Sequence, residues 1–358
     1  MSTVSMLTLD GGHGEGGGQV LRSASTLAVL LGRPIEVENI RAGRKRPGLR
    51  PQHAGLLRFL AHLTDGTVDG AEPGSTRIRF EPGTAEAGDH EWDIGTAGST
   101  TLFLQAALPV LALTPGRSRL AVTGGTDVSH SPTIDWFKNV YVDRMRPVAD
   151  SLELHCPRRG FYPKGGGHVI LDVDNKEFDR DLESIRGRVR DRLGVSRTEQ
   201  QHIVTAEGTS VAEERLSERD VAPRQAEAAR RFFQEHELLV PRMTIRTPGA
   251  ASIGTALALW CEDDDGNRIG GDALGEIGTP AEDVGINAAR ATYEDLMTGA
   301  TVDRHLADQW VIWVALGAGA VRYPRMTGHL ETDTWTCRRF LGDDVVRLDG
   351  GVIRGQRD

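Results

Sequence analysis

Residues 7–40 read LTLDGGHGEGGGQVLRSASTLAVLLGRPIEVENI, and the rest of the chain can be interpreted by comparison with this stretch. Residues 5–10 predict a strand, and glycines at 11–18 predict a turn. The apolar residues of 18–31 predict a helix, which Gly32-Arg33-Pro34 would end because glycine and proline are typical helix stops. Residues 35–40 predict a second strand. This order of strand, glycine-rich turn, helix and strand is the unit to look for elsewhere.

The same order returns twice. Asp93-Ile94-Gly95 leads into Gly98-Ser99-Thr100, an apolar helix to Leu113 and a strand at 120–123. A looser copy has a helix at 305–316 and a strand at 320–323. Further helices with apolar residues at i, i+3, i+4 spacing are predicted at 50–63, 134–152 and 280–297. We therefore predict an α+β fold built of three α/β repeats, about 80 residues long between the first two copies, with helices packed on one face of each sheet.

The composition changes between about residues 183 and 274, where charge density rises. A polar helix is predicted at 222–236, with strands at 202–205, 243–246 and 256–261. We interpret this segment as a small inserted α/β domain. The remaining parts, 1–182 and 275–358, would form one large catalytic domain of three repeats.

The bulk composition limits the class of protein. The 358 residues are 39% hydrophobic and 26% charged, which is typical of a folded globular chain. No apolar run of about 18 residues or secretory signal pattern occurs, so we expect a cytoplasmic protein with no membrane partner. The three cysteines are far apart and form no metal-binding spacing. A net charge of −9 disfavours non-specific binding to long nucleic acid but allows a local basic cleft.

The string GHGEGGGQVLR at 12–22 is the first candidate site. Consecutive glycines before a helix let backbone N–H groups approach a phosphate, and a helix N-terminus favours an anion. It is not a Walker loop. Glu15 could hold a metal that bridges phosphates, and Arg22 lies one turn into the helix. The alternative is a tight turn that needs glycine for its backbone conformation.

The string RAGRKRPGLRPQH at 41–53 is the second candidate. Arginine binds phosphate oxygens through paired hydrogen bonds, so Arg41 and Arg44 are candidate phosphate ligands. Gln52 and His53 follow at the start of a helix with donors of their own. A solvated basic loop is the alternative interpretation.

Two further patterns carry less information by themselves. GGTDVSHSP at 124–132 is most simply a turn after a strand. The eleven histidines show no HExxH or other metal-ligand spacing, and His329 lies just beyond a predicted strand.

Taken in order, these strings resemble the RNA 3′-terminal phosphate cyclase family. The resemblance spans nearly the whole chain, with the insert matched least. It rests on DGGHGEGGGQVLRSA, IRAGRKRPGLRPQH, IGTAGSTTLFLQAALP, GGTD, RGFYPKGGG, HLADQ and the late GHL.

The resemblance implies three α/β repeats of the kind also seen in enolpyruvyl transferases, and an ATP-dependent reaction on RNA with a 3′-phosphate end. ATP would adenylate a histidine, AMP would pass to the RNA 3′-phosphate, and the 2′-OH would close a 2′,3′-cyclic phosphate. The nucleophile would be His329, and Glu15 would bind a divalent metal, Mg²⁺ or Mn²⁺. The phosphate and RNA ligands would be Arg22, Arg41, Arg44, Gln52 and His53. The adenine pocket would be formed by Pro132, His305, Asp308 and Gln309.

This sequence departs from the family pattern at two places. His305 precedes LADQ where some members have tyrosine, and LETD follows His329 where a more apolar run is usual. Two rival functions are compatible with the fold: a non-catalytic cyclase-like ribosome-assembly protein, against which His329 argues, and an enolpyruvyl transferase, for which the sequence carries no positive sign. The sequence does not determine the oligomeric state, and a homodimer stays open.

Overall fold

The first repeat forms a four-stranded sheet with two helices. The computed structural model describes residues 5–356. The sheet has the order β1-β2-β4-β3, in which β1 runs parallel to β2 and the other neighbours are antiparallel. Gly32 ends the first helix in the left-handed conformation, at φ 56°, as its position in the sequence predicts. The elements are β1 (Leu7–Asp10), α1 (Gln19–Leu31), β2 (Ile35–Glu38), α2 (Pro51–Thr64), β3 (Thr67–Asp69) and β4 (Ile78–Glu81).

The second repeat has the same topology. Its sheet has the order β5-β6-β8-β7, again with a parallel first pair and antiparallel partners after it. Four strands in the same order and orientation confirm the repeat that the sequence predicts. The main elements are β5 (Asp89–Asp93), α3 (Thr100–Ala112), β6 (Gly116–Gly124), β7 (Ser151–Arg158) and β8 (Gly167–Asn175).

The second helical segment of this repeat differs from the prediction of one helix at 134–152. It consists of α4 (Ile134–Trp136), a π-helical turn η1 (Phe137–Val142), α5 (Asp143–Met145) and a 3-10 turn η2 (Arg146–Val148). Pro147 has no backbone N–H to donate to a longer helix, and Ser151 and Leu152 already belong to β7. The helix predicted from the apolar spacing therefore ends too late, at residue 152 instead of Val148.

The third repeat is reduced to three strands, in the order β13-β15-β14. Its missing first strand is represented by a single parallel bridge between Arg197 and Val321. The chain leaves the repeat after Arg197 and returns at Thr301, whose hydroxyl donates to the Arg197 carbonyl at 2.7 Å. The elements are β13 (Val321–Arg322), β14 (Val346–Asp349), β15 (Val352–Gly355), α9 (Arg304–Ala315) and α10 (Gly328–Leu341).

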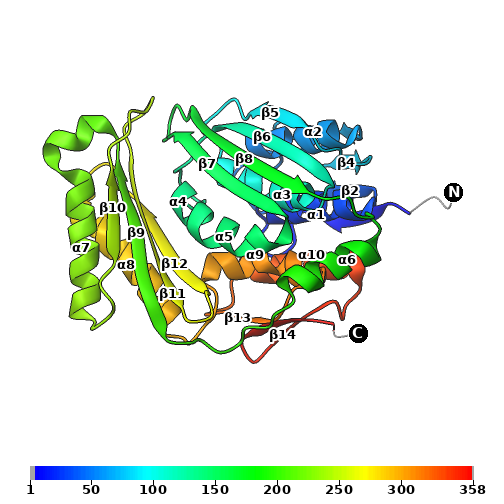
Figure 1. Ribbon diagram of the computed structural model, residues 1–358. Helices are drawn as coiled ribbons and strands as arrows, with labels where there is room; N and C mark the ends of the chain where they lie inside the picture. The colour runs from blue at the N-terminus through cyan, green and yellow to red at the C-terminus, as the bar shows by residue number, and fades with distance from the viewer. Residues whose placement is uncertain (1–4, 357–358) are drawn as a thin grey trace.

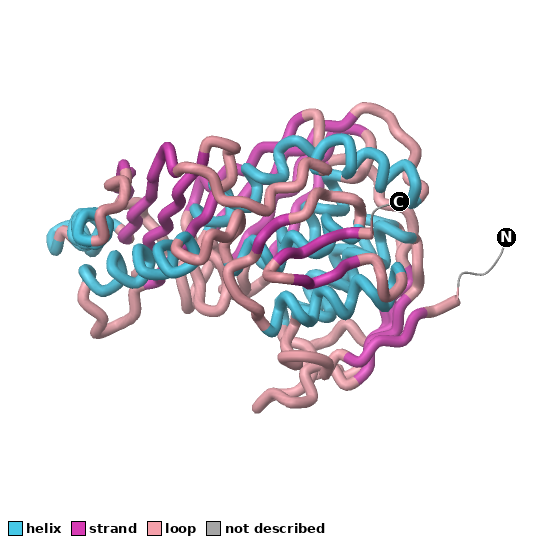
Figure 2. Tube along the Cα trace, turned by 90° about the horizontal axis from the view of Figure 1, so that it is seen from below, coloured by secondary structure: helices cyan, strands magenta, loops and turns pink. Residues whose placement is uncertain are grey.

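The segment between these two points forms a second sheet-and-helix body. Its sheet has the order β10-β9-β11-β12, and it lies to one side of the three repeats in Figure 1 and, seen from below, in Figure 2. The elements are β9 (Ile203–Ala212), η3 (Glu214–Arg219), α7 (Val221–Glu235), β10 (Arg242–Arg246), β11 (Thr255–Asp263), β12 (Arg268–Leu274) and α8 (Ala281–Leu296).

Core packing bears on the limits of this inserted domain. Helix α6 (Leu182–Leu193) buries Ile185, Val189 and Leu193 in the large core, whereas α8 buries Val284 and Ala288 in the core of the insert. The sequence predicts nearly all of α6 in the insert and α8 in the large domain, which is the opposite of this packing. We now propose that the insert covers about residues 198–300, between the first strand and first helix of the third repeat.

The helices of the three repeats share one core. Helix α1 packs against α2, α3 and α10, and α9 packs against α10. Helices α1, α3 and α9 are central and apolar almost all round, and most of their polar side chains are buried. In the part of the chain that the structure describes, no helix is long and apolar enough to cross a membrane.

Candidate active site

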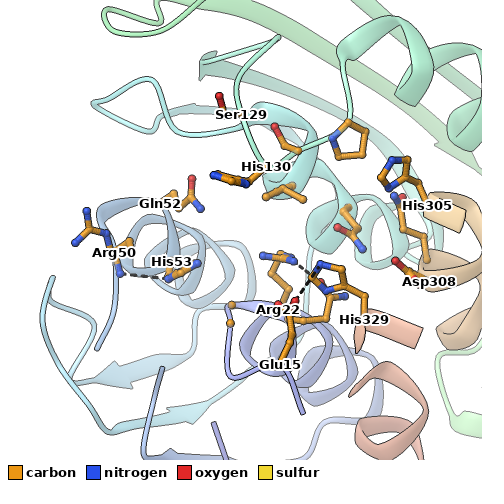
Figure 3. A pocket seen from close by; sticks show the side chains of 18 of the residues that line it. Glu15, Arg22, Arg50, Gln52, His53, Ser129, His130, His305, Asp308 and His329 are labelled. Atoms are coloured by element: carbon orange, nitrogen blue, oxygen red, sulfur yellow. Dashed lines mark hydrogen bonds and ion pairs between the residues drawn. The ribbon is translucent and has the colours of Figure 1, made fainter. Parts of the chain in front are cut away.

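One cleft of about 840 Å³ contains every site residue expected from the sequence. It lies where the three repeats and the insert meet, and Figure 3 shows the labelled side chains turned toward it from different elements. The expected residues on its wall are Glu15, Arg22, Arg41, Arg44, Gln52, His53, Pro132, His305, Asp308, Gln309 and His329. Residues up to 314 positions apart in the sequence are therefore brought together by the fold.

The cleft is built largely from the starts of helices. Arg22, His53 and Gln105 lie in the first two turns of α1, α2 and α3, while His305 and His329 lie in the first turns of α9 and α10. A helix N-terminus carries partial positive charge, and five of them around one cavity favour an anion. A protein with a net charge of −9 can thus hold phosphate groups locally.

Helix α10 was not predicted, and it determines where His329 lies. The Thr327 hydroxyl caps the helix by accepting from Leu330 N at 2.9 Å, and it also donates to Asp308 Oδ1. His329 follows in the first turn, with Nε2 3.5 Å from Glu15 Oε2. Burial lowers the pKa of His329; Arg22, His305 and Arg44 lower it further, while Glu15 raises it. The lowered pKa favours the neutral imidazole, which is the nucleophilic form.

His53 is held in a defined tautomer. Its Nδ1 accepts from the Arg50 backbone N–H at 3.2 Å, so the proton lies on Nε2. Burial, followed by the charges of Arg22, Arg41 and Arg50, lowers the pKa of His53 to about 3. A side chain added at Gly18 would come 2.3 Å from His53 Nε2, so the glycine loop and the histidine fit only because position 18 is bare. The functional and the tight-turn interpretations of this loop are therefore compatible.

The two central arginines differ in burial. Arg22 is 7% exposed, whereas the Arg44 side chain is 43% exposed and lies 3.4 Å from Glu15. Arg41 adopts a positive φ of 55° and donates to the carbonyls of Arg46 and Gly48, so the basic segment is a shaped loop rather than a free solvated one. Arg22, Arg41 and Arg44 all line the cleft, so this part of its surface is cationic.

Three polar atoms on the cleft wall are buried without a hydrogen-bond partner among residues 5–356. They are Arg22 Nε, Gln309 Oε1 and His329 Nδ1. Buried polar atoms are rarely left unpaired in proteins. Two of them belong to side chains expected to contact the nucleotide or its phosphates, so these side chains have a donor and an acceptor left for a polar ligand.

The part of the cleft that contains Pro132 and His305 has one aromatic ring fixed by an edge-to-face contact. The His305 ring lies 5.5 Å from the Trp136 ring at 76°, and Trp136 Nε1 donates to Asp303, the capping residue of α9. Pro132 also lines the cleft. An aromatic ring fixed along its edge can present a face to a planar ligand.

Sequence reasoning missed several wall residues. Gln105 is a polar residue between apolar ones in α3, a signal available in the sequence, and Ser129 to Ser131 belong to the GGTDVSHSP string. That string is more than a turn, because Asp127 and Asp135 form buried ion pairs with Arg159 at 3.1 and 2.7 Å and hold the loop against the cleft. The remaining missed residues are Gly17, Gly18, Gln19, Arg50, Leu102, Asp272, Ala273, Leu274 and Glu276.

Fold and site together define a class: an α+β repeat protein with a histidine beside a carboxylate and several arginines in a cleft that favours phosphate groups. The family model for RNA 3′-terminal phosphate cyclase matches residues 13–346. The RNA 3′-terminal phosphate cyclase of Pyrobaculum aerophilum is 40% identical over 93% of this chain and 92% of its own length. The protein of that name from Pyrococcus abyssi is 40% identical over 97% and 96%, and that from Methanopyrus kandleri 39% over 94% of both. The chain belongs to the RNA 3′-terminal phosphate cyclase family.

Proposed function

We propose that this protein uses ATP to convert an RNA 3′-phosphate into a 2′,3′-cyclic phosphate, with His329 as the carrier of AMP. The observation that carries the proposal is the meeting of His329, Glu15, Arg22 and Arg44 on one wall of the cleft, in a chain of this family. A neutral histidine beside cationic groups suits phosphoryl chemistry, which depends mainly on positioning and charge stabilisation.

The first step is capture of the nucleotide. Nε2 of His329 attacks the α-phosphorus of ATP, the bond to the bridging oxygen breaks, and pyrophosphate leaves. Attack from Nε2 requires the imidazole proton on the buried Nδ1. Arg22 and Arg44 would stabilise the charge on the transferring phosphoryl group, and the adenine would lie between Pro132 and His305 with Asp308 and Gln309 nearby.

The second and third steps use the stored AMP. An oxygen of the RNA 3′-phosphate attacks the phosphorus on His329, so the N–P bond breaks and RNA(3′)pp(5′)A forms. The neighbouring 2′-OH then attacks the 3′-phosphorus, loses its proton, closes the ring and releases AMP. Splitting the closure into steps lowers each barrier. Arg41, Arg44, Gln52 and His53 would bind the terminal phosphate, since all four line the cleft.

Glu15 is the residue that would hold a divalent metal, Mg²⁺ or Mn²⁺. Among the residues that the structure describes, no group of three or more histidine, cysteine, aspartate or glutamate side chains could hold an ion alone. A single carboxylate completed by substrate phosphates is the usual arrangement for Mg²⁺, so the residues fit an ion delivered with ATP. When bound, such an ion would neutralise phosphate charge.

Incubation with ATP labelled in the α-phosphate tests the proposal. We expect a protein-bound AMP that is labile in acid and stable in alkali, followed by its transfer to RNA ending in a 3′-phosphate but not in a 3′-OH. No label on the protein would instead support a non-catalytic relative or an enolpyruvyl transferase.

A further inference from the structure

We propose that Asp333 is a positioning residue that orients Arg22 through the side chain of Gln19. The proposal rests on the proposed function only in taking Arg22 as a phosphate ligand. It concerns Asp333 and Gln19, which have no direct part in the chemistry described above.

The three side chains form a continuous buried chain of hydrogen bonds. Gln19 Nε2 donates to both carboxylate oxygens of Asp333, at 2.9 and 2.7 Å. Gln19 Oε1 in turn accepts from Arg22 Nη2. Asp333, Gln19 and Arg22 are 1%, 3% and 7% exposed, so water cannot replace these bonds.

The polarity of this chain allows one orientation of the Gln19 amide. The guanidinium of Arg22 only donates, so the Gln19 carbonyl must face it, and the Gln19 NH₂ group must then face Asp333. The bond from Nη2 to Gln19 fixes the orientation of the Arg22 guanidinium, and Arg22 Nε has no partner among the described residues. The relay therefore holds an arginine ready to donate to an anion in the cleft.

The relay needs an acceptor oxygen at position 333 more than a charge. Burial raises the pKa of Asp333 to about 7, and the protonated form still offers its carbonyl oxygen to Gln19. Asparagine keeps such an oxygen, whereas leucine has a similar volume and none. The two substitutions therefore separate the acceptor from the space that the side chain fills.

The relay also joins the helix of His329 to the helix of Arg22. Asp333 ends the LETD string and lies four residues after His329 on α10, one turn further along the same helix. Gln19 and Arg22 lie on α1. The bonds thus fix the position of α10, which carries the proposed nucleophile, relative to α1, which carries the proposed phosphate-binding arginine.

Binding of inorganic pyrophosphate and of ATP by the full-length protein, measured by calorimetry without RNA, tests the relay. We expect Asp333→Leu to weaken both affinities roughly tenfold and Asp333→Asn by less than about threefold. The control is Thr336→Val on the same helix, which is buried and whose hydroxyl donates only to Thr332 O. It should leave both affinities unchanged. Equal losses in Asp333→Asn and Asp333→Leu, or the same loss in Thr336→Val, would overturn the proposal.

A double-mutant cycle with Arg22→Ala decides whether Asp333 acts through Arg22. In the Arg22→Ala background, Asp333→Leu should weaken pyrophosphate binding no further, whereas independent effects would add. Additive losses would contradict the relay. If Asp333→Leu does not fold, Gln19→Met, which breaks the same chain from α1, is expected to give the tenfold loss and the same lack of additivity. These readouts need no turnover, so a protein without cyclase activity would overturn the proposed function and leave the relay standing.

Discussion

The imidazole Nε2 of His329 lies 3.5 Å from Oε2 of Glu15, although the two residues belong to the third and the first repeat. Glu15 lies in the glycine-rich turn before α1, and His329 lies in the first turn of α10. Helices α1 and α10 pack directly against each other. The contact therefore places the expected metal-binding carboxylate beside the expected nucleophile without any direct link along the chain.

We predict that His329→Ala abolishes labelling of the protein by ATP and cyclisation of RNA while the fold is kept. The His329 side chain is 41% exposed, so its removal leaves no large cavity. Labelling and circular dichroism check both parts. His62→Ala, on α2 and outside the cleft, is the control. An adduct that persists in the variant, or that maps to His305 or His53, would show that another histidine is the nucleophile.

Removing either arginine should weaken use of ATP and RNA, and Arg22 should cost more than Arg44. A charged hydrogen bond from buried Arg22 is worth about 2–4 kcal/mol, whereas the half-exposed Arg44 is screened by water and should give about 1 kcal/mol. The measurement is kcat/KM at subsaturating substrate for Arg22→Ala and Arg44→Ala. Equal turnover by the wild type and Arg44→Ala would exclude a contact from Arg44.

The adenine pocket is tested at position 305. We expect His305→Ala to weaken use of ATP by about 1–2 kcal/mol through lost stacking, and His305→Tyr to restore it because the larger ring covers more of the base. The ATP dependence of adenylation measures both. If both variants keep the wild-type dependence, His305 does not contact the base.

The buried neutral His53 makes stability depend on pH. Its pKa is about 3 in the folded protein and near 6.5 when unfolded, so the unfolded chain binds the extra proton between these values. The free energy of unfolding should therefore fall as pH drops below 6.5, by up to about 2 kcal/mol from this group at pH 5. His53→Asn keeps an acceptor for Arg50 N but cannot be protonated. Urea unfolding at pH 7 and pH 5 should show a smaller difference in the variant; an unchanged difference would contradict the assignment.

The insert should be dispensable for capture of AMP but not for full affinity. Its ends meet at Arg197 and Thr301, so a short Gly/Ser linker can replace residues 198–300. The insert carries no expected catalytic residue, yet Asp272 to Leu274 line the cleft and Gly270 N donates to Asp303. We expect the folded deletion variant to form the AMP adduct at a raised ATP concentration. A folded variant that takes up no AMP at any concentration would show that the insert supplies an essential group.

Local sequence patterns gave the repeat unit and its boundaries correctly in several places. Gly32 ends α1 in the left-handed conformation, and Ser99 caps α3 by accepting from Leu102 N, both as expected from helix-end chemistry. The same reasoning failed at 149–152, where the apolar spacing of a helix and the alternation of β7 overlap. It missed α10, GHLETDTWTCRRFL at 328–341, because the buried face of this helix is largely polar and includes Thr332, Asp333, Thr334 and Thr336.

The sequence by itself determined the elements of each repeat and the residue types of the site, since caps, turns and apolar periods act over a few residues. Only the tertiary structure decided which residues share the cleft and which core each boundary helix joins. Asp333 reaches Gln19 across 314 positions because α10 packs on α1, and α8 joins the insert because its apolar face meets α7. Such pairings depend on burial of complementary surfaces far apart in the chain, and no local pattern of residues encodes them.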